Sequence, residues 1–539
     1  GGISSTDTQT ACDSLTWIDG ITYTASNNTA THTLTAANGC DSVVSLDLTI
    51  NNSIVGFDYN GTTEFCADGV STIPNITTTS GGTFTSSSGG IVIDPLTGKI
   101  DLTNSIPGNY QITYTPPSSI YNFTPLGSQF LGLNAGNNFG EAVAMNNAGN
   151  IIAIGIPKSD VGGTMSGMVK VYQLNGNIWN QLGTDIIGNV EQKLGFSLAL
   201  NPSGNRLVIG CPDIGGDVPG TIKGKAKVYE WDGNNWSQLG SDIEGLGDGD
   251  EFGYAVDINS SGTRIVVGEK ALDYNNSHSG RVAVFEFDGQ NWNQIGSDLL
   301  GAAYHYSFGW KVDINASGNK IIVSAKDAGD NLNGGTNGFI WAGAIYSYIY
   351  DGLDWVLEGS EINGQSDNEN FGKTLGANQS GTRLVGSGNT VTRAYEFNGS
   401  SWQQLGSDLN LNLKPLSVSM NSNGNRMVIG FNSFIAGNHG GYVKVFEYDG
   451  IDWVEQANEI VGLNNGDSLG YSVAANAQGN QFVVGIPGLD QNGLSSGGAQ
   501  VYTSSATACT LPLDITIHPS PTIDLGTDTT LICAGTSQT

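Results

Sequence analysis

The sequence is poor in basic residues. Its 539 residues include 20 Lys and Arg against 50 Asp and Glu, which gives a formal net charge of −30. A surface of this sign repels phosphate backbones, so we exclude nucleic acid as a partner. No apolar run approaches the length of a transmembrane helix, and the sequence therefore predicts no membrane insertion of this segment.

Residues that commonly carry catalysis are also scarce. The chain has 5 His, which are scattered, and it contains no HExxH or phosphate-binding-loop motif. Paired carboxylates for glycoside hydrolysis need a defined separation across a cleft, and no sequence pattern here specifies one. We therefore predict that the protein is not an enzyme, and an enzyme acting on extracellular polysaccharide is the least favoured alternative.

Glycine, by contrast, is abundant at 78 residues, as expected for an all-β chain with many turns. Between residues 120 and 505 a pattern of roughly fifty residues recurs seven times. One copy, residues 238–293, together with the first residues of the next, holds four short segments of β-type composition: FGYAVDI, RIVVG, RVAVFEF and WNQIGSDL. Four strands per unit are typical of one propeller blade, so we predict a seven-bladed β-propeller over residues 120–505.

A tryptophan marks the same point of most repeats. It follows a polar turn and occurs at Trp179, Trp236, Trp292, Trp355, Trp402 and Trp453. The last repeat stops after its third strand, and residues 121–132 carry the missing fourth, with Phe123 in the tryptophan position. We predict that this N-terminal strand completes the seventh blade and leaves no sheet edge open.

Recurring Phe-Gly pairs, an aliphatic residue three positions beyond each Gly, a VIG or VVG segment and a closing GxVxVY segment resemble FG-GAP-type β-propeller repeats. Some propellers of that family hold calcium in DxDxDG loops. The matching turns here read NNAGN, NPSGN, NSSGT, NASGN, NQSGT, NSNGN and NAQGN, and they supply no carboxylates. We expect these turns to be structural, with Gly at positive φ and Asn in a local side-chain bond.

The segment before the repeats predicts two smaller β modules. Residues 1–53 read as a small module in which Cys12 and Cys40 could form a disulfide that closes a loop of about 28 residues. Paired cysteines also suit zinc, but no CxxC pattern or neighbouring His supports a zinc site. Residues 54–119 read as an immunoglobulin-like (Ig-like) sandwich that lacks one strand.

The missing strand of the sandwich follows the repeats. Residues 506–519 have β-type composition and carry Cys509, which we expect to form a disulfide with Cys66. The fold class predicted is thus all-β, with a seven-bladed propeller inserted into an Ig-like sandwich. Cys211 replaces an apolar residue and predicts a buried free thiol. Residues 520–539 predict the start of a further Ig-like module, in which Cys533 would find its partner outside this chain, so we expect further modules of the same long chain.

Residues 1–53 resemble modules repeated in large surface and secreted proteins of the Bacteroidetes. This resemblance implies export by the type IX secretion route, display at the cell surface, a role in attachment or gliding motility, and an oxidising compartment that suits disulfides.

The repeat predicts two faces with different loops. The Asn-x-x-Gly turns and the DG or NG turns form one face, called the bottom, and the longer variable loops form the other, called the top. Variable loops on a rigid scaffold commonly carry binding specificity. Aromatic and acidic side chains in these loops are our predicted ligand contacts: Tyr304, His305, Tyr306, Trp341, Tyr274 and Asp273.

The segment GDGDE is the best metal candidate. Its carboxylates, Asp248, Asp250 and Glu251, offer the oxygen ligands that calcium prefers. A solvated acidic loop explains the same residues in a chain this acidic. The sequence thus implies no certain cofactor, with calcium as the one candidate.

Two classes of function are favoured over catalysis. The first is a segment of a large secreted adhesin, in which the top loops bind an extracellular glycan or protein. The second is a structural stalk or filament segment with no ligand of its own.

Overall fold

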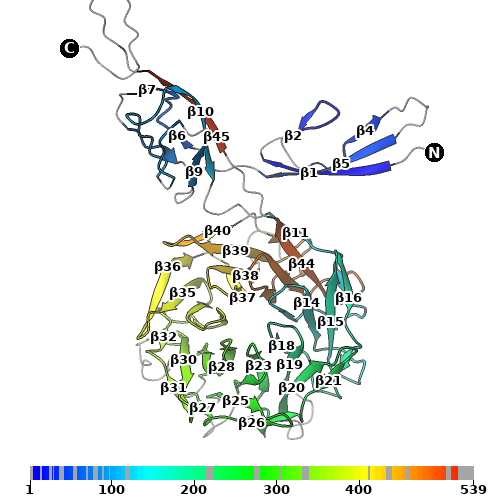
Figure 1. Cartoon of the computed structure of the whole chain (residues 1–539). Coiled ribbons are helices and arrows are strands. Elements are labelled where there is room, and N and C mark those ends of the chain that lie inside the picture. Colours follow the sequence, from blue (N-terminus) through cyan, green and yellow to red (C-terminus); the bar gives the residue numbers. More distant parts are fainter. Residues whose placement is uncertain are drawn as a thin grey trace, which may run out of the picture. The chain divides into compact units, whose positions relative to one another are not determined.

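The computed structural model (Figure 1) describes residues 4–12, 15–23, 27, 29–34, 42–51, 57–67, 71–76, 83–87, 90–95, 97–115, 122–212, 223–271, 279–302, 306–329, 339–410, 413–432, 440–456, 460–505 and 511–519. Over these residues the protein is all-β and has no helix, which confirms the predicted class. It follows that none of the described residues belong to a membrane-crossing helix. The chain forms two compact units, one of Gly1–Asn122 with Ala506–Thr539 and one of Phe123–Ser505.

The larger unit consists of seven small antiparallel sheets of four or five strands. The first three are β13 (Ala142–Met145), β14 (Ile151–Ile156), β15 (Met168–Asn175), β16 (Ile178–Gln181) and β17 (Ile186–Ile187); β18 (Ser197–Leu200), β19 (Arg206–Cys211), β20 (Lys223–Trp231), β21 (Trp236–Gln238) and β22 (Ile243–Asp248); and β23 (Phe252–Ile258), β24 (Arg264–Glu269), β25 (Arg281–Phe287), β26 (Trp292–Gln294) and β27 (Leu299–Leu300).

The next three sheets repeat this order: β28 (Phe308–Ile314), β29 (Lys320–Ala325), β30 (Ala344–Tyr350), β31 (Trp355–Leu357) and β32 (Ile362–Asn363); β33 (Thr374–Ala377), β34 (Arg383–Ser387), β35 (Val391–Phe397) and β36 (Trp402–Asn410); and β37 (Lys414–Met420), β38 (Arg426–Asn432), β39 (Tyr442–Tyr448), β40 (Trp453–Glu455) and β41 (Ile460–Val461). The seventh joins β42 (Val473–Ala475), β43 (Gln481–Ile486) and β44 (Gly498–Ser505) to β11 (Asn122–Pro125) and β12 (Phe130–Leu131).

The seventh sheet therefore takes its outer strands from the start of the unit. Phe130 pairs with Ala499 of β44, and the backbone N–H of Leu126 donates to the carbonyl of Val501 at 2.8 Å. This confirms the predicted closing strand. Because β11 and β12 cover β44, the sheet is completed without an added chain.

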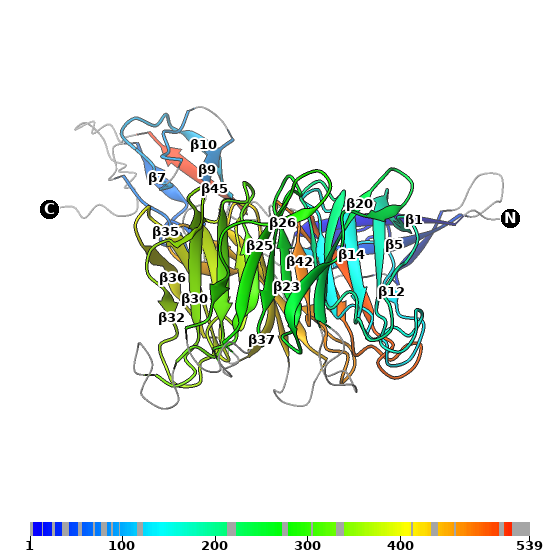
Figure 2. The ribbon, with the colours of Figure 1, turned by 90° about the horizontal axis from the view of Figure 1, so that it is seen from below.

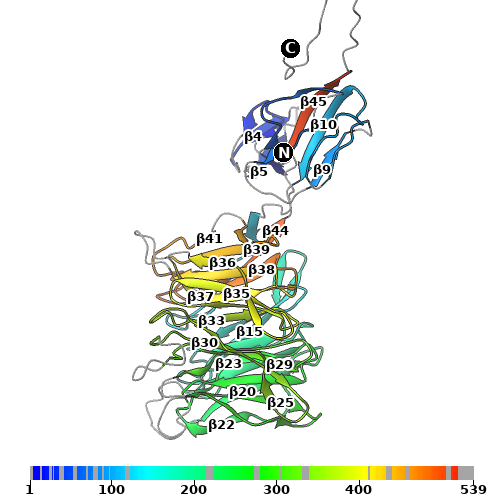
Figure 3. The same cartoon turned by 90° about the vertical axis from the view of Figure 1, so that its left-hand side faces the viewer.

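The first strand of each sheet lies innermost, near a common centre (Figure 1). Contacts between these strands run from β13 through β18, β23, β28, β33 and β37 to β42, and β42 contacts β13 again. Figures 2 and 3 show the same sheets edge-on, with their strands running between two faces of the unit. The sheets thus follow one another around a single axis.

Backbone hydrogen bonds connect the seven Asn-x-x-Gly turns in the same cyclic order. They run from Asn147 to Pro202 and then from Ser260 through Ala316, Gln379, Ser422 and Ala477 back to Asn147, at 2.8–3.2 Å. Each donor is the N–H of one turn and each acceptor is the carbonyl of the next. The step from Pro202 to Ser260 has no such bond because proline has no N–H.

The turns themselves are built as the sequence predicts. The Oδ1 atom of Asn259 accepts hydrogen bonds from the N–H groups of Thr263 and Arg264, both at 2.9 Å. Gly262 has a φ of 69°, a conformation that favours glycine. Equivalent asparagines in the other six repeats accept from the backbone N–H five residues further on, as Asn259 does from Arg264.

Five of the six repeated tryptophans connect neighbouring sheets by a hydrogen bond, whereas the indole N–H of Trp402 is buried without a partner among the described residues. The indole N–H of Trp236 donates to the carbonyl of Leu182 in the preceding sheet at 3.1 Å, and Trp292 bonds Leu239 at 2.9 Å. Trp179 makes the same bond to Leu126 of the N-terminal segment. This segment therefore carries both the pairing and the inter-sheet bond of an ordinary fourth strand.

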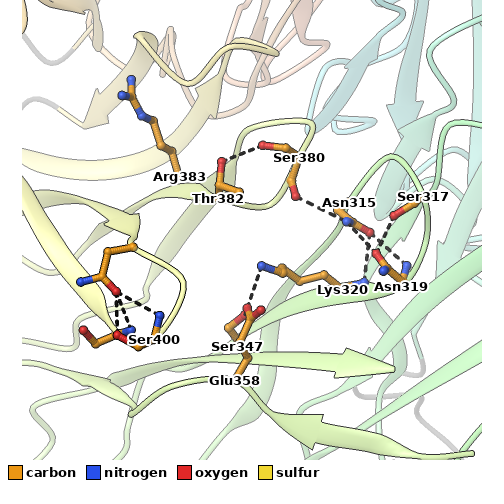
Figure 4. A network of polar contacts seen from close by, with 12 residues as sticks. Asn315, Ser317, Asn319, Lys320, Ser347, Glu358, Ser380, Thr382, Arg383 and Ser400 are labelled. Carbon is orange, nitrogen blue, oxygen red and sulfur yellow. Dashed lines mark hydrogen bonds and ion pairs between the residues drawn. The ribbon is translucent and has the colours of Figure 1, made fainter. Parts of the chain in front are cut away.

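Basic side chains make a second connection at the bottom turns, which the sequence reasoning did not identify. Arg264 pairs with Glu286 of its own sheet at 2.8 Å, donates to the carbonyl of Gly318 in the next sheet, and lies 5.3 Å from the ring centroid of Tyr350. Lys320 takes this place in the fourth sheet and pairs with Glu358 at 2.7 Å (Figure 4).

Two carboxylates lie side by side at the axis. Asp257 accepts a hydrogen bond from the N–H of Ile314, and Asp313 accepts one from Ala377. Each side chain thus connects its own first strand to the next. Burial, followed by the charge of Asp313, raises the pKa of Asp257 well above its usual value, and burial raises the pKa of Asp313 to about 6.

The smaller unit holds the remaining strands. These are β1 (Ser4–Cys12), β5 (Ser42–Asn51) and β4 (Thr31–Leu34); β7 (Glu64–Cys66), β45 (Leu511–His518), β10 (Gly108–Thr115) and β9 (Thr83–Ser86); and the pairs β2 (Leu15–Thr16) with β3 (Thr22–Tyr23) and β6 (Phe57–Asp58) with β8 (Asn75–Ile76). Strand β45 follows the larger unit in sequence, yet it lies between β7 and β10 in one sheet. Its Ile515 and Ile517 pack into one core with Tyr59, Phe84 and Tyr114.

The cysteines divide into bonded and free. Cys66 is disulfide-bonded, and its predicted partner Cys509 lies outside the described residues. Cys12 ends β1, while Cys40 and Cys533 also lie outside the described part. Cys211 is free and buried, and burial raises the pKa of its thiol to about 12. It therefore behaves as a small apolar residue, as predicted.

The asparagine turns give a direct stability prediction. Asn259→Ala removes the acceptor of two backbone N–H groups and should lower the free energy of unfolding by about 1–3 kcal/mol. Urea denaturation measures this loss. The control is Ser261→Ala in the same turn, which removes an exposed hydroxyl and should cost less than about 0.5 kcal/mol. Equal effects of the two changes would contradict a structural role for the asparagine.

The axial carboxylates predict an unusual pH dependence. Because the folded-state pKa values are raised, the folded protein binds more protons than the unfolded chain between about pH 4 and the raised pKa, so stability falls as pH rises. Asp257→Asn keeps an acceptor for the Ile314 N–H and removes the charge. Thermal melts should show an increase of a few degrees at pH 7.5 and little change at pH 4. A lower melting temperature at pH 7.5 would show that the ionised pair is stabilising.

Candidate functional site

A cavity of about 340 Å³ lies on the axis of the larger unit, lined by the first strands of all seven sheets. The residue at one position of each repeat contributes to its wall. This position follows the glycine of the Phe-Gly or Leu-Gly pair in six repeats, and its occupants are Glu141, Phe196, Tyr254, Trp310, Lys373, Leu416 and Tyr471. We call these seven residues the axial ring. They lie just before or near the start of the strands that lead toward the Asn-x-x-Gly turns, so the cavity lies toward the top face.

The glycine before each axial-ring residue explains this placement. Gly253 has a φ of 88°, and a Cβ atom there would collide with the carbonyl oxygen of Lys225 on β20. The backbone of the first strand therefore packs directly against the third strand of the preceding sheet. The next side chain, Tyr254, is then directed to the cavity. In the sixth repeat Pro415 stands before Leu416 instead.

Three consecutive members of the axial ring, Phe196, Tyr254 and Trp310, have aromatic side chains in contact with one another, and we call them the aromatic arc. The ring centroids of Phe196 and Tyr254 are 5.1 Å apart, and those of Tyr254 and Trp310 are 5.0 Å apart. The indole N–H of Trp310 donates to the carbonyl of Lys373 at 3.0 Å. Tyr471 is the most exposed of the four aromatics, at 41%. The cavity thus offers apolar ring surfaces of fixed orientation.

Two lysines lie against this aromatic arc. The Nζ atom of Lys270 is 4.3 Å from the ring centroid of Tyr254, and that of Lys326 is 4.4 Å from the ring centroid of Trp310. Such contacts are favourable cation–π interactions. Glu251 pairs with Lys270 at 3.0 Å, and burial with the charge of Glu251 raises the pKa of the Tyr254 hydroxyl. Tyr254 is therefore neutral at physiological pH.

The predicted ligand residue Tyr306 is not available to a ligand. Its side chain is 8% exposed, packs in a core with Phe308 and Tyr346, and its hydroxyl lies 2.7 Å from that of Tyr346. The prediction that Tyr306 contacts a ligand is therefore wrong. The physical reason is that β30 supplies a hydrogen-bond partner that allows this tyrosine to be buried.

Trp341, by contrast, is 41% exposed and stands with exposed Phe339 and Ile340 in the loop before β30. The structure does not bring it to Tyr306. The other predicted ligand residues, Tyr304, His305, Tyr274 and Asp273, lie outside the described residues.

The predicted metal residues are only partly described. Asp250 is buried, and Glu251 pairs with Lys270. The side chain of Asp248 lies outside the description. Within the side chains that the structure describes, no group of three or more His, Cys, Asp or Glu is arranged to hold a metal ion. The ion pair gives Glu251 a role that needs no calcium.

A second depression, of about 650 Å³, lies among the bottom turns of the fourth to sixth sheets. Polar residues in and beside it bond one another: Asn315 donates to the carbonyl of Ser380, and Ser380 bonds Thr382 (Figure 4). Arg383 pairs with Glu396. These contacts belong to the turn and inter-sheet network described above. We therefore take the axial cavity as the candidate site.

The axial ring was missed by sequence reasoning, although the sequence contains its signal. The glycine that precedes it recurs in six repeats, whereas the axial-ring position holds acidic, aromatic, basic and aliphatic residues. A variable position inside an otherwise regular motif indicates a side chain that does not serve the packing of the repeat. Comparison with known proteins adds no further guide, since no family model matches the sequence and no curated protein matches it.

The different placements of Tyr306 and Trp341 predict different outcomes of the same change. Tyr306→Ala opens a cavity in a core and should lower the free energy of unfolding by about 3–5 kcal/mol. Trp341→Ala truncates a partly exposed side chain and should cost about 1 kcal/mol or less. Thermal or urea unfolding of both variants measures this. A large loss for Trp341→Ala would place that tryptophan in a core.

Proposed function

We propose that residues 123–505 form a seven-bladed β-propeller of the FG-GAP type. Seven consecutive antiparallel sheets, a first strand that completes the last sheet, and a cyclic series of turn-to-turn hydrogen bonds support this proposal. The smaller unit, in which β45 joins strands that precede the repeats, supports an Ig-like sandwich that carries the propeller as an insertion.

We further propose that the propeller is a binding head that takes a glycan into its axial cavity. The arc formed by Phe196, Tyr254 and Trp310, with Tyr471 on the same ring, is the observation that carries this function. Sugar rings have apolar faces that pack on aromatic side chains and hydroxyls that need polar neighbours. The cavity wall combines both kinds of residue.

The size of the cavity favours a small ring over a protein surface. About 340 Å³ lies at the lower end of the range of small-molecule sites, roughly 300–1,000 Å³. A protein ligand would instead need about 800 Å² of contact on each partner. We therefore place a single sugar, or the end of a chain, in the cavity and leave the surrounding loops to contact the rest.

We propose binding without turnover. Among the described residues that line the cavity, Glu141 is the one carboxylate, and it accepts a hydrogen bond from Asn138 at 3.2 Å and lies 3.9 Å from Lys158. Hydrolysis of a glycosidic bond normally uses two carboxylates on opposite sides of that bond. The residues that line the cavity instead suit binding of a sugar without its hydrolysis.

We place this head in a secreted cell-surface adhesin. The disulfide at Cys66 suits an oxidising compartment. The resemblance of the first 53 residues to Bacteroidetes surface modules supports type IX export and a role in attachment. In this view the smaller unit and any further modules of the chain serve to display the propeller.

The exposed tyrosine of the axial ring gives the test. Tyr471→Ala in the whole 539-residue chain should weaken binding on a glycan array, or in titrations of its hits, by about tenfold, because it removes one stacking face at modest cost in stability. The matched control is Trp341→Ala, which removes an aromatic of the same exposed fraction, 41%, outside the axial ring.

Three results are informative. Loss of glycan binding in the Tyr471→Ala variant alone supports the axial site. Loss of glycan binding in the Trp341→Ala variant alone would place the site in the top loop that holds Trp341. No binding by the unaltered chain to any glycan would favour the stalk or filament role and contradict the proposal.

A further inference from the structure

The basic residues of the larger unit are few and most have carboxylate partners. Arg281 is paired with both Glu269 and Asp298, and Arg393 with Glu369 and Asp408. The same is true of cations on the blades and at the bottom turns: Lys170, Arg206, Lys225, Lys227, Arg264, Lys320, Arg383, Arg426 and Lys444. In a chain this acidic, most cations have a carboxylate close enough to form an ion pair.

Two lysines in the wall of the axial cavity depart from this rule. Lys311, on β28, and Lys373, immediately before β33, both line the cavity, and neither forms an ion pair with any described residue. They belong to neighbouring first strands, which the bond from Trp310 to the Lys373 carbonyl holds together. The aromatic arc therefore ends at two unneutralised ammonium groups.

The surroundings of these two lysines disfavour the charged ammonium form of their side chains. Burial lowers the pKa of Lys311 below its usual value. Burial, and then the charges of Lys414 and Lys326, lower the pKa of Lys373. Because a lowered lysine pKa means that the folded state disfavours the ammonium, both residues reduce the stability of the free protein at neutral pH.

The nearby carboxylates are already engaged. Glu141 bonds Asn138 and lies near Lys158, Asp327 pairs with Lys326 at 2.7 Å, and Asp313 accepts from the backbone of Ala377. The positive charge of the cavity wall is therefore not cancelled within the site. A group that supplied a negative charge would relieve this cost when it bound.

We propose that Lys311 and Lys373 make the axial cavity selective for an anionic sugar, one whose ring carries a carboxylate or a sulfate. The ring would pack on the aromatic arc, and the anionic group would accept hydrogen bonds from the two ammonium groups. This inference rests on the proposed glycan-binding function and specifies the class of glycan.

The test compares ligands that differ only in charge. Glucose, glucuronic acid and glucose 6-sulfate are titrated into the whole chain by calorimetry at low and high salt. The charged sugars should bind about ten- to a hundredfold more tightly than glucose at low salt, and the advantage should shrink at high salt. The two charged sugars distinguish a carboxylate from a sulfate preference.

The variants Lys311→Met and Lys373→Met keep the length and the apolar stem of each side chain. Each should remove most of the preference for charged sugars over glucose, and keep or raise the melting temperature, because an unpaired charge is removed. The control, Lys99→Met, changes net charge equally at an exposed site of the smaller unit. It should change none of these quantities.

The outcomes separate this inference from the function on which it rests. Equal binding of glucose and glucuronic acid that the methionine variants do not change would overturn the anionic preference and leave the glycan site standing. Methionine variants that unfold more easily and keep the preference would show that the lysines are structural. No binding of any of the three sugars would overturn both proposals.

Discussion

The close approach of the seven first strands around one axis is the constraint on which the rest of the larger unit depends. These strands contact each other in cyclic order, and backbone hydrogen bonds join their turns at every step except that from Pro202 to Ser260. Such an arrangement leaves no room for side chains where sheets meet most closely, which explains the glycines at positive φ before the axial ring. It also requires that the last sheet be completed, and β11 with β12 does so.

The same constraint separates residues that connect the seven sheets from residues whose identity can change from repeat to repeat. The asparagine turns, the tryptophan bonds and the Arg264-type contacts repeat because each one connects or supports a sheet. The axial-ring position supports none of these contacts. Its side chains converge on one small volume, so variation there changes the chemistry of the cavity without disturbing the sheets. This physical division is why we place recognition at the axis.

Much of the architecture was predictable from sequence because it rests on local, repeated signals. The turn role of Asn259 and Gly262, the fourth-strand role of β11 and β12 and the buried thiol of Cys211 all follow from short patterns. The site was less predictable because it depends on convergence. Phe196, Tyr254 and Trp310 are separated by more than fifty residues each and meet only at the axis.

The error at Tyr306 has a related cause. A tyrosine in a loop predicts an exposed contact, but the hydroxyl of Tyr346, forty residues away in sequence, satisfies its polar atom and permits burial. No local pattern in the sequence reports such a partner. The inter-sheet role of the arginines was missed for the same reason, since the Gly318 carbonyl that Arg264 contacts belongs to the next repeat.

The central claim is that the ligand enters the axial cavity. Fluorine NMR of the whole chain labelled with 5-fluorotryptophan tests it most directly, with the resonances of Trp310 and Trp341 assigned from their phenylalanine variants. Addition of glucuronic acid should shift the Trp310 resonance in a saturable manner and leave that of Trp341 unchanged. A shift of Trp341 with no change at Trp310 would contradict the axial site.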